Sequence, residues 1–293
     1  MLSVYPVFYP RFACKAADCR HSCCRGWEID VDEKSAARYL RQGGALGEAL
    51  RAALEADEAG WHFRLDAEER CPFLRRDGLC RLICELGEDS LCDICALHPR
   101  FYGEQGDLEL CGLGLSCEKS VELLLESPEP LRFIAGDTFW ELPALLDNLG
   151  LTVDPEALRF TPHPDRERYA ALLARLEKTE PIDALWPQEL SALRAALDSL
   201  VPAAERYAQG YDAGRFDRIF AYILFRQLER LEEYGLSALL AFARDSTEFV
   251  FLQDALRPDT AEHLRRWSEQ IEYDEENTAR LIRACGRALS SIL

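Results

Sequence analysis

The chain of 293 residues lacks several features that would assign it to a common class. No apolar run approaches the roughly 20 residues of a membrane span, because even the stretch 219–225 is bounded by Arg218 and Arg226. Met1 to Pro6 contain neither a charged segment nor the apolar segment of an export signal. We therefore expect a soluble, cytoplasmic protein without a membrane partner.

Positive charge is also scarce. Lys and Arg number 34 against 52 Asp and Glu, which gives a formal net charge of −18. Proteins that bind phosphate backbones concentrate Lys and Arg, so this balance argues against a nucleic-acid partner. An acidic surface suits a cationic substrate such as a lysine side chain, although net charge of this sign also serves solubility alone.

Cysteine is absent from residues 118–284, yet eleven of the twelve cysteines lie between Cys14 and Cys117. A chain that is 48% hydrophobic can build a core without disulfides, and a cytoplasmic setting keeps thiols reduced. Clustered thiols then favour one or two metal sites, with redox thiols and disulfides as alternatives. Cys285 shares a helical stripe with Leu281, Ile282, Leu289 and Ile292, and we interpret it as a buried free thiol.

The cysteine spacing lacks the signatures of common metal modules. The run from Cys14 through Cys19 to Cys23 and Cys24 has neither the C-x2-C knuckles of a zinc ribbon nor the C-x3-C-x2-C spacing of radical S-adenosylmethionine clusters. Because neighbouring side chains diverge on a strand or helix, Cys23 and Cys24 should rarely reach one ion together.

Later cysteines give stronger local signals. A reversing pair at Asp77-Gly78 should bring Cys71 and Cys80 together. Cys92 and Cys95 form a C-x2-C pair, followed by His98, which we weigh below the cysteines because Pro99 restricts its backbone. His62, alone in a strand-like run, is interpreted as structural.

The choice between iron–sulfur and zinc is open at this stage. Cys71-Pro72 matches the Cys-Pro pairing found beside cluster ligands, and the cysteine spacings are looser than those of zinc modules. The sequence therefore favours an iron–sulfur cluster of the four-iron type over zinc.

The predicted fold is mainly α, with a cysteine-rich, metal-binding N-terminal half of short strands packed on a C-terminal helical bundle. We place the boundary between residues 1–127 and 128–293, where cysteine disappears. Residues 4–12 should be extended and pack against the cysteine region, with strands at 26–32 and 61–65. The predicted helices are 33–42, 46–57, a short one at 82–87, 138–149, 165–178, 188–200, 215–234, 236–251, 260–269 and 275–292.

Short motifs along most of the chain resemble the flagellin lysine N-methylase family, whose members carry a cysteine-rich region described as zinc- or iron-chelating. The motifs are Tyr5-Pro6, Phe12, Cys19-x3-Cys23-Cys24-x-Gly26-Trp27, Cys71-Pro72-Phe73-Leu74, Gly78-Leu79-Cys80, Leu86-Gly87-Glu88, Cys95 with Pro99-Arg100, Leu115-Ser116-Cys117, Tyr222 with Phe225-Arg226, and Gln270-Ile271-Glu272-Tyr273 with Glu276-Asn277.

This resemblance implies methyl transfer from S-adenosylmethionine to surface lysines of flagellin, with an Fe–S cluster or zinc held by cysteines. Cys84, Cys92 and Cys111 fall outside the family pattern. The metal ligands that the resemblance implies are Cys14, Cys19, Cys23, Cys24, Cys71, Cys80, Cys95 and Cys117.

Methyl transfer to lysine requires that the ammonium group lose its proton, for which a nearby acidic group or tyrosine is suited. We therefore predict Glu272, Tyr273 and Asn277 as catalytic candidates. The alternative interpretation is an N-cap and surface polar cluster around Asp274.

A second function class stays open beside the methyltransferase. The sequence lacks the strand, glycine-rich turn and helix that hold a nucleotide-like cofactor in Rossmann-type enzymes, so no donor-binding residues are predicted. The alternative is a non-enzymatic or redox metal-binding module that docks a protein partner.

Overall fold

The computed structural model describes residues 1–290, with side chains as far as residue 287. Ile292, where the last helix was predicted to end, and the side chain of Leu289 lie outside the described residues. The chain divides into two compact units, residues 13–101 and residues 1–12 together with 102–293, which we call the thiol unit and the helical unit. This division differs from the predicted one at residue 127, because residues 102–127 supply strands and a helix to the helical unit.

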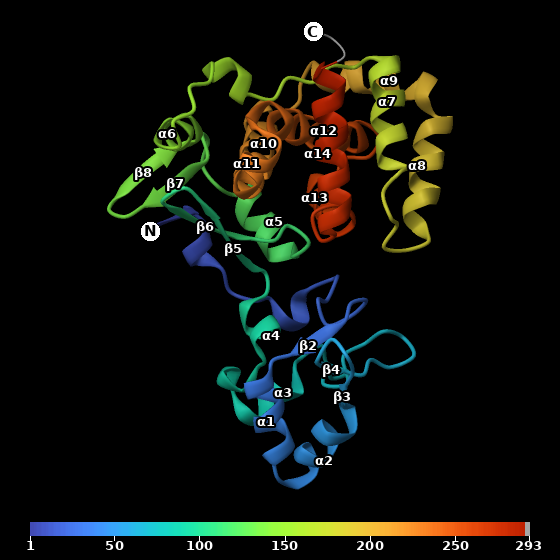
Figure 1. Ribbon diagram of the computed structural model, residues 1–293. Helices are drawn as coiled ribbons and strands as arrows, with labels where there is room; N and C mark the ends of the chain where they lie inside the picture. The colour runs from blue at the N-terminus through green and yellow to red at the C-terminus, as the bar shows by residue number, and fades with distance from the viewer. Residues whose placement is uncertain (291–293) are drawn as a thin grey trace. The chain divides into compact units, whose positions relative to one another are not determined.

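The thiol unit is built from short elements (Figure 1). Asp32 begins the first helix, where its carboxylate accepts a hydrogen bond of 2.8 Å from the Ser35 amide. The strands and α-helices of the thiol unit are β2 (Ile29–Val31), α1 (Glu33–Arg41), α2 (Gly44–Ala53), β3 (Leu54–Ala56), β4 (Trp61–Phe63), α3 (Arg81–Leu86) and α4 (Asp93–Leu97). The three strands form an antiparallel sheet in the order β2-β4-β3.

A five-stranded sheet opens the helical unit, in the order β5-β6-β1-β7-β8. The first strand, β1, lies between β6, to which it is parallel, and β7, to which it is antiparallel. The strands are β1 (Leu2–Pro6), β5 (Arg100–Gln105), β6 (Leu108–Leu113), β7 (Arg132–Ala135) and β8 (Thr138–Glu141). Residues 2–6 are extended, as predicted for the start of the segment 4–12, and they pair with β6, which carries Cys111 of the cysteine region. Residues 9–11 instead form a 3-10 turn.

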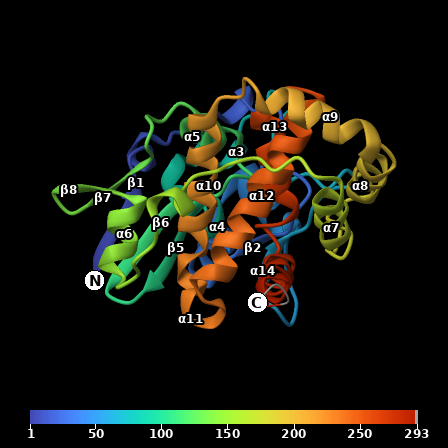
Figure 2. The ribbon, with the colours of Figure 1, turned by 90° about the horizontal axis from the view of Figure 1, so that it is seen from above.

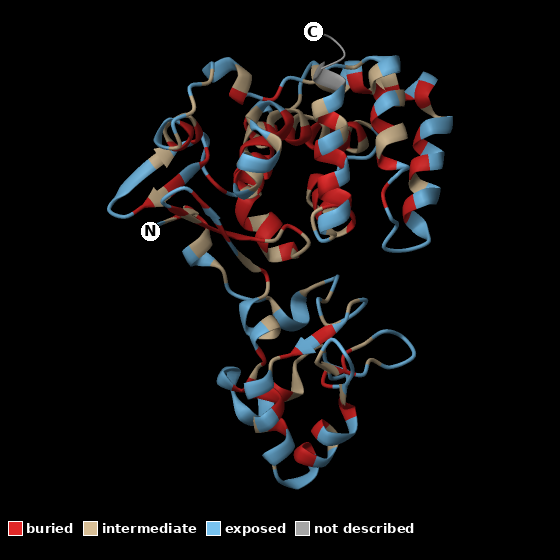
Figure 3. Ribbon diagram, viewed as in Figure 1, coloured by how far each residue is buried: buried red, intermediate tan, exposed pale blue. Residues whose placement is uncertain are grey.

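Ten α-helices account for most of the remaining described residues of the helical unit. The long α12 lies between α10 and α14 (Figure 2), and buried residues concentrate on α10 and α12 (Figure 3). The helices are α5 (Glu118–Leu125), α6 (Leu142–Asn148), α7 (Arg166–Leu176), α8 (Leu185–Ala195), α9 (Leu197–Ala208), α10 (Ala213–Gln227), α11 (Leu231–Tyr234), α12 (Leu236–Leu256), α13 (Thr260–Gln270) and α14 (Glu275–Ser290).

Five predicted helices have bounds that differ by several residues. The helix at 236–251 continues to Leu256, and the other four differ for local reasons. The helix at 46–57 ends at Ala53, because residues 54–56 pair with β4. The helix at 138–149 begins only at Leu142, because Gly136, at a φ of +57°, lets residues 138–141 turn back onto β7. The region 188–200 holds parts of two helices, with Pro187 in the first turn of α8. The region 215–234 divides at the 3-10 turn 228–230.

In the part of the chain that the structure describes, no helix combines the length and the apolar character needed to cross a bilayer. The prediction of a mainly helical chain with short strands and a C-terminal helical bundle is confirmed.

Candidate functional site

A tight turn at Asp77-Gly78 organises the cysteines of the thiol unit. Gly78 adopts a φ of +79°, and its amide donates to the Arg75 carbonyl over 3.0 Å. Leu74 forms a β-bridge with Cys80 across this turn, which confirms the predicted hairpin. The Cys71 amide also donates to the Cys24 carbonyl over 2.9 Å, so the turn, Cys24 and Cys71 belong to one local structure.

Five thiols border a single apolar core. Tyr39, Phe63 and Phe73 form its aromatic centre, with Phe63 and Phe73 at a ring-centroid distance of 4.9 Å. Two of the cysteines are buried within this core and three are partly buried against it. We call these five the thiol cluster: Cys24, Cys71, Cys80, Cys92 and Cys95.

The thiols of the cluster influence one another's protonation. Burial raises the pKa of Cys71 to about 12, and negative charge on Cys24 and Cys80 acts in the same direction. The Cys95 thiol donates a hydrogen bond to Cys92; this bond, followed by burial, raises the pKa of Cys95, while the same bond lowers that of Cys92. Ionising more than one thiol in this apolar surrounding is unfavourable, and a bound metal cation would relieve that repulsion.

The paired cysteines Cys23 and Cys24 also interact. A hydrogen bond from the Cys23 thiol lowers the pKa of Cys24 to about 7, although burial opposes this. Cys23 itself is exposed, whereas Cys24 packs against the core. The two adjacent side chains therefore differ in burial, although a hydrogen bond joins their thiols.

The eight ligands that the resemblance implies belong to both units of the chain. Cys24, Cys71, Cys80 and Cys95 belong to the thiol cluster, and Cys14, Cys19 and Cys23 are exposed or half-buried in the same unit. Cys117 instead stands at the start of α5 in the helical unit.

Three cysteines fall outside the family pattern, and one of them, Cys92, belongs to the thiol cluster. The C-x2-C pair that it forms with Cys95 is the signal in the sequence that could have identified it. Cys84 is exposed on α3. Cys111 is buried on β6 of the helical unit, with its sulfur 3.6 Å from Glu109. Cys285 is buried on α14, as predicted.

His98 follows the thiol cluster directly in the chain. Its ring lies 5.5 Å from that of Trp27, and burial lowers its pKa to about 4, so the imidazole is neutral near pH 7. Within the described residues its Nε2 is buried and has no hydrogen-bond partner. A neutral imidazole with an unused buried nitrogen is suited to bind a metal.

The helical unit holds a buried polar network where β6 meets α10. The Tyr222 hydroxyl donates to the Leu113 carbonyl and accepts from the Leu113 amide, each over 2.7 Å. The Arg226 guanidinium, on the same helix, also donates to the Leu113 carbonyl, over 3.3 Å. Its Nε lies 2.9 Å from the carboxylate of Glu272, which is almost fully buried and accepts from the Ser268 hydroxyl over 2.8 Å.

The three predicted catalytic residues therefore occupy different surroundings. Glu272 is paired with Arg226 inside the protein, and burial raises its pKa. Asn277 is buried and uses its amide in bonds to the backbone of Glu180 and Gln270. Tyr273 is exposed, at 44%. The Asp274 carboxylate accepts a hydrogen bond of 2.9 Å from the backbone amide of Asn277 at the start of α14, in agreement with the N-cap interpretation.

Comparison with curated proteins places this chain beside lysine methylases. Over 132 residues it is 28% identical to a lysine-N-methylase of Salmonella typhimurium, a match that covers 43% of this chain and 33% of the relative. A lysine-N-methylase of Salmonella choleraesuis is 28% identical over 135 residues, with the same coverage. The flagellar biosynthetic protein FliU of Salmonella muenchen is 27% identical over 132 residues, which cover 43% of this chain and 78% of that protein.

The match spans about a third of the length of the two methylases. No family model matches the chain. No solved structure matches it either. The resemblance to lysine N-methylases that the motifs indicate is thus confirmed by curated relatives over 43% of the chain.

Proposed function

We propose, from the similarity to two lysine-N-methylases, that this chain takes part in methylating lysine side chains of a protein substrate, with S-adenosylmethionine as the methyl donor. Flagellin is the proposed substrate, supported by the similarity to a flagellar biosynthetic protein. The net charge of −18 also suits a substrate that presents lysines.

The reaction sets clear chemical demands. A lysine ammonium, with an ordinary pKa of about 10.4, must first lose a proton. The neutral nitrogen then attacks the methyl carbon of the sulfonium, the carbon–sulfur bond breaks, and its electron pair stays on sulfur as a thioether. No electron is exchanged with a metal, so we assign the thiol cluster a structural role.

Of the three catalytic candidates, Tyr273 is the one whose side chain is exposed enough to contact a lysine. Its amide donates to the Ser268 carbonyl over 3.0 Å, and Glu272 accepts from the Ser268 hydroxyl. Asn277 binds the Gln270 carbonyl at the end of α13. We therefore propose Glu272 and Asn277 as positioning residues for the turn that carries Tyr273.

The thiol cluster fits an Fe–S cluster better than a single zinc ion. Tetrahedral zinc with bonds of about 2.3 Å holds its sulfur ligands about 3.8 Å apart. Among the described cysteines, no three sulfur atoms lie within 4.8 Å of one another. A multi-iron cluster, whose ligands bind different iron atoms, accepts more widely spaced thiolates. His98 or a thiol of the flanking segment 14–23 would complete either ligand set.

The methyl-transfer proposal is tested with the full chain, purified under anaerobic conditions and incubated with flagellin and methyl-labelled S-adenosylmethionine. We expect label on flagellin lysines, and a loss of at least tenfold in rate for Tyr273→Phe, whose ring keeps its packing but lacks the hydroxyl. Tyr102→Phe, at a tyrosine that is 50% exposed, is the matched control. Absence of label with fully metallated protein would favour the module that only binds metal and a partner.

The metal proposal is tested by elemental analysis, acid-labile sulfide and visible absorption of the same preparation. We expect iron and sulfide, with reduced content in Cys80→Ser and Cys95→Ser and unchanged content in Cys285→Ala. A colourless protein with stoichiometric zinc and no sulfide would exclude the iron–sulfur assignment. Equal loss in all three variants would exclude the thiol cluster as the site.

A further inference from the structure

The polar face of the small sheet in the thiol unit gathers acidic side chains around one histidine. His62 on β4 stands opposite Asp30 of β2 and Glu55 of β3. Because side chains alternate between the two faces of a strand, Glu28 and Asp57, each two residues along, fall on this same face. The opposite face carries Ile29, Val31, Leu54 and Phe63 into the core.

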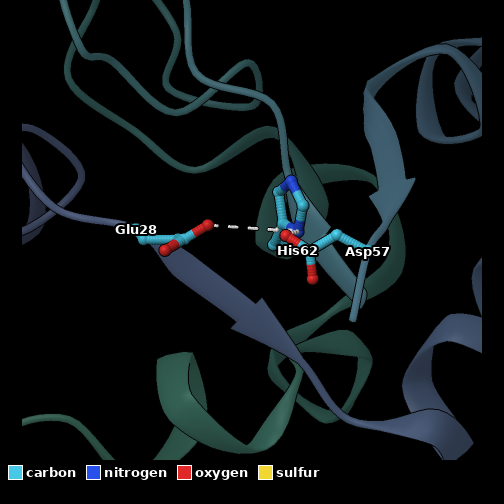
Figure 4. A group of neighbouring side chains, drawn as sticks. All are labelled: Glu28, Asp57 and His62. Carbon is cyan, nitrogen blue, oxygen red and sulfur yellow. Dashed lines mark ion pairs between the residues drawn. The ribbon is translucent and has the colours of Figure 1, made fainter. Parts of the chain in front are cut away.

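Three of these side chains converge. Nδ1 of His62 lies 4.0 Å from the Glu28 carboxylate and 3.8 Å from that of Asp57 (Figure 4). One donor atom from each residue lies within 4.8 Å of the other two. A tetrahedral site with bonds of about 2.1 Å has its donors about 3.4 Å apart, so the two distances from Nδ1 would shorten by roughly half an ångström when an ion binds.

The positions of two donors are fixed by their surroundings. The other oxygen of Asp57 accepts from the amides of Ala59 and Gly60, over 2.8 and 3.2 Å, which holds the carboxylate in the β3–β4 turn. His62 is only 18% exposed at its side chain and lies on the central strand. The site is therefore partly organised before any ion binds.

Glu55 lies beside the ring nitrogen of His62 that would not bind the metal. Its carboxylate lies 3.9 Å from Nε2 of His62, on the opposite side of the ring from Glu28 and Asp57, and Arg64 holds it over 2.9 Å. A carboxylate on that side favours the tautomer with its proton on Nε2, which leaves the Nδ1 lone pair directed at the other two carboxylates. Histidine ligands of metals ordinarily have such a partner.

Charge balance also favours a cation here. Within residues 1–287, neither Glu28 nor Asp57 forms an ion pair with lysine or arginine; each pairs with His62 alone. From these observations we propose that Glu28, Asp57 and His62 form a site for a divalent transition-metal cation, separate from the thiol cluster. One imidazole with two carboxylates suits Mn²⁺, Fe²⁺ or Zn²⁺ better than the all-oxygen cations Ca²⁺ and Mg²⁺. The site does not depend on the proposed methyl transfer.

Mn²⁺ is the suitable probe, because it prefers oxygen and nitrogen donors and the thiols of the same unit compete for it weakly. The full chain, with its thiols kept reduced, is titrated while electron paramagnetic resonance follows the free ion. We expect one bound Mn²⁺ per chain. Asp57→Asn, which keeps the acceptor for the turn amides, and His62→Gln should each weaken binding by tenfold or more, and Glu55→Gln by about tenfold.

Glu58→Gln is the matched control, because it removes one charge beside Asp57 without removing a donor. This variant should leave the affinity for Mn²⁺ unchanged. Equal weakening by Glu58→Gln would show that Mn²⁺ binds to a diffuse acidic surface and not to a defined site. A second readout uses the ring nitrogen resonances of the five histidines, of which His62 should broaden first on addition of Mn²⁺. Absence of binding, or first broadening of another histidine, would overturn the proposal.

Discussion

The cores of the two units differ in the residue types that form them. In the helical unit, α10 and α12 bury long runs of aromatic and aliphatic residues, and Phe216 packs 5.3 Å from Phe251. In the thiol unit, no described helix exceeds ten residues, and five cysteines border the core. Isolated helices of that length are marginal in water. The comparison indicates that hydrocarbon packing stabilises the helical unit, and we propose that the thiol unit depends on a metal bound by its cysteines.

Removing the metal should give the largest effect and the sharpest test of this difference. Metal binding to structural thiolate sites contributes about 10 kcal/mol or more to folding of small domains. We expect a chelator to abolish amide-exchange protection in β2 and β4 while α10 and α12 keep theirs. Loss of protection in both units together, or in neither, would contradict the division.

Breaking the buried ion pair should destabilise the helical unit alone. Arg226→Ala leaves the Glu272 carboxylate buried without its partner, which should cost about 3–5 kcal/mol. The control is Arg166→Ala, whose pair with Asp198 is exposed to solvent and should contribute little to stability. Urea unfolding followed by hydrogen exchange in α10 measures both, and equal effects would show that burial of the pair is unimportant.

Glu248 should dominate the pH dependence of the stability of the helical unit. Burial raises the pKa of Glu248 to about 7, although Arg168 and hydrogen bonds from His163 and Tyr169 favour the charged form. The unfolded chain ionises near 4.5 while the folded protein keeps its proton, so stability should fall as pH rises from about 4.5 to 7.

That fall should be on the order of 3 kcal/mol, and Glu248→Gln, which keeps the acceptor oxygen, should remove it. The exposed Glu205→Gln serves as control. Urea unfolding at pH 5 and pH 8 gives the comparison, and a parallel pH dependence in wild type and Glu248→Gln would refute the assignment.

The smallest expected effect is at the start of α1 in the thiol unit. Asp32→Ala removes the acceptor of the Ser35 amide and that of the Asp93 amide, and should cost about 1 kcal/mol. Burial raises the pKa of Asp32, but these amides outweigh it and hold the pKa below its usual value. Its contribution is therefore present near neutral pH and lost as pH falls through that lowered pKa.

Amide exchange in α1 measures the loss, and Asp32→Asn, which still accepts a hydrogen bond, should retain most of the protection. An effect of Asp32→Ala on α10 of similar size would mean that the two units do not unfold independently.

The sequence predicted features whose cause is local. The helix that begins at residue 33 and the reversing pair Asp77-Gly78 were predicted from residue type and spacing, and both are confirmed. The pairing of β1 with β6 was not predicted, because Leu2 and Leu108 are far apart in the chain and nothing in either segment specifies the other. Residues 138–141 were predicted as helix, but they form strand β8 because they pair with β7.

The candidate site shows the same limit. The concentration of cysteines indicated a thiol site, but the membership of Cys92 in the thiol cluster and of Cys117 in the helical unit depend on tertiary structure. His62 was interpreted as structural because it stands alone in its own segment, whereas its four acidic neighbours come from β2, β3 and the residues beside them. Such a group forms only when the sheet does.

The position of β1 has a consequence for biosynthesis. Its neighbours β6 and β7 are translated only after residues 13–101, so the sheet of the helical unit stays incomplete until the whole thiol unit has left the ribosome. A thiol unit that folds first would bring Leu2 and Leu108 closer together than a flexible loop of that length does, which lowers the entropy cost of pairing them. Iron or zinc supply during translation would then set how quickly the N-terminal strand finds its place.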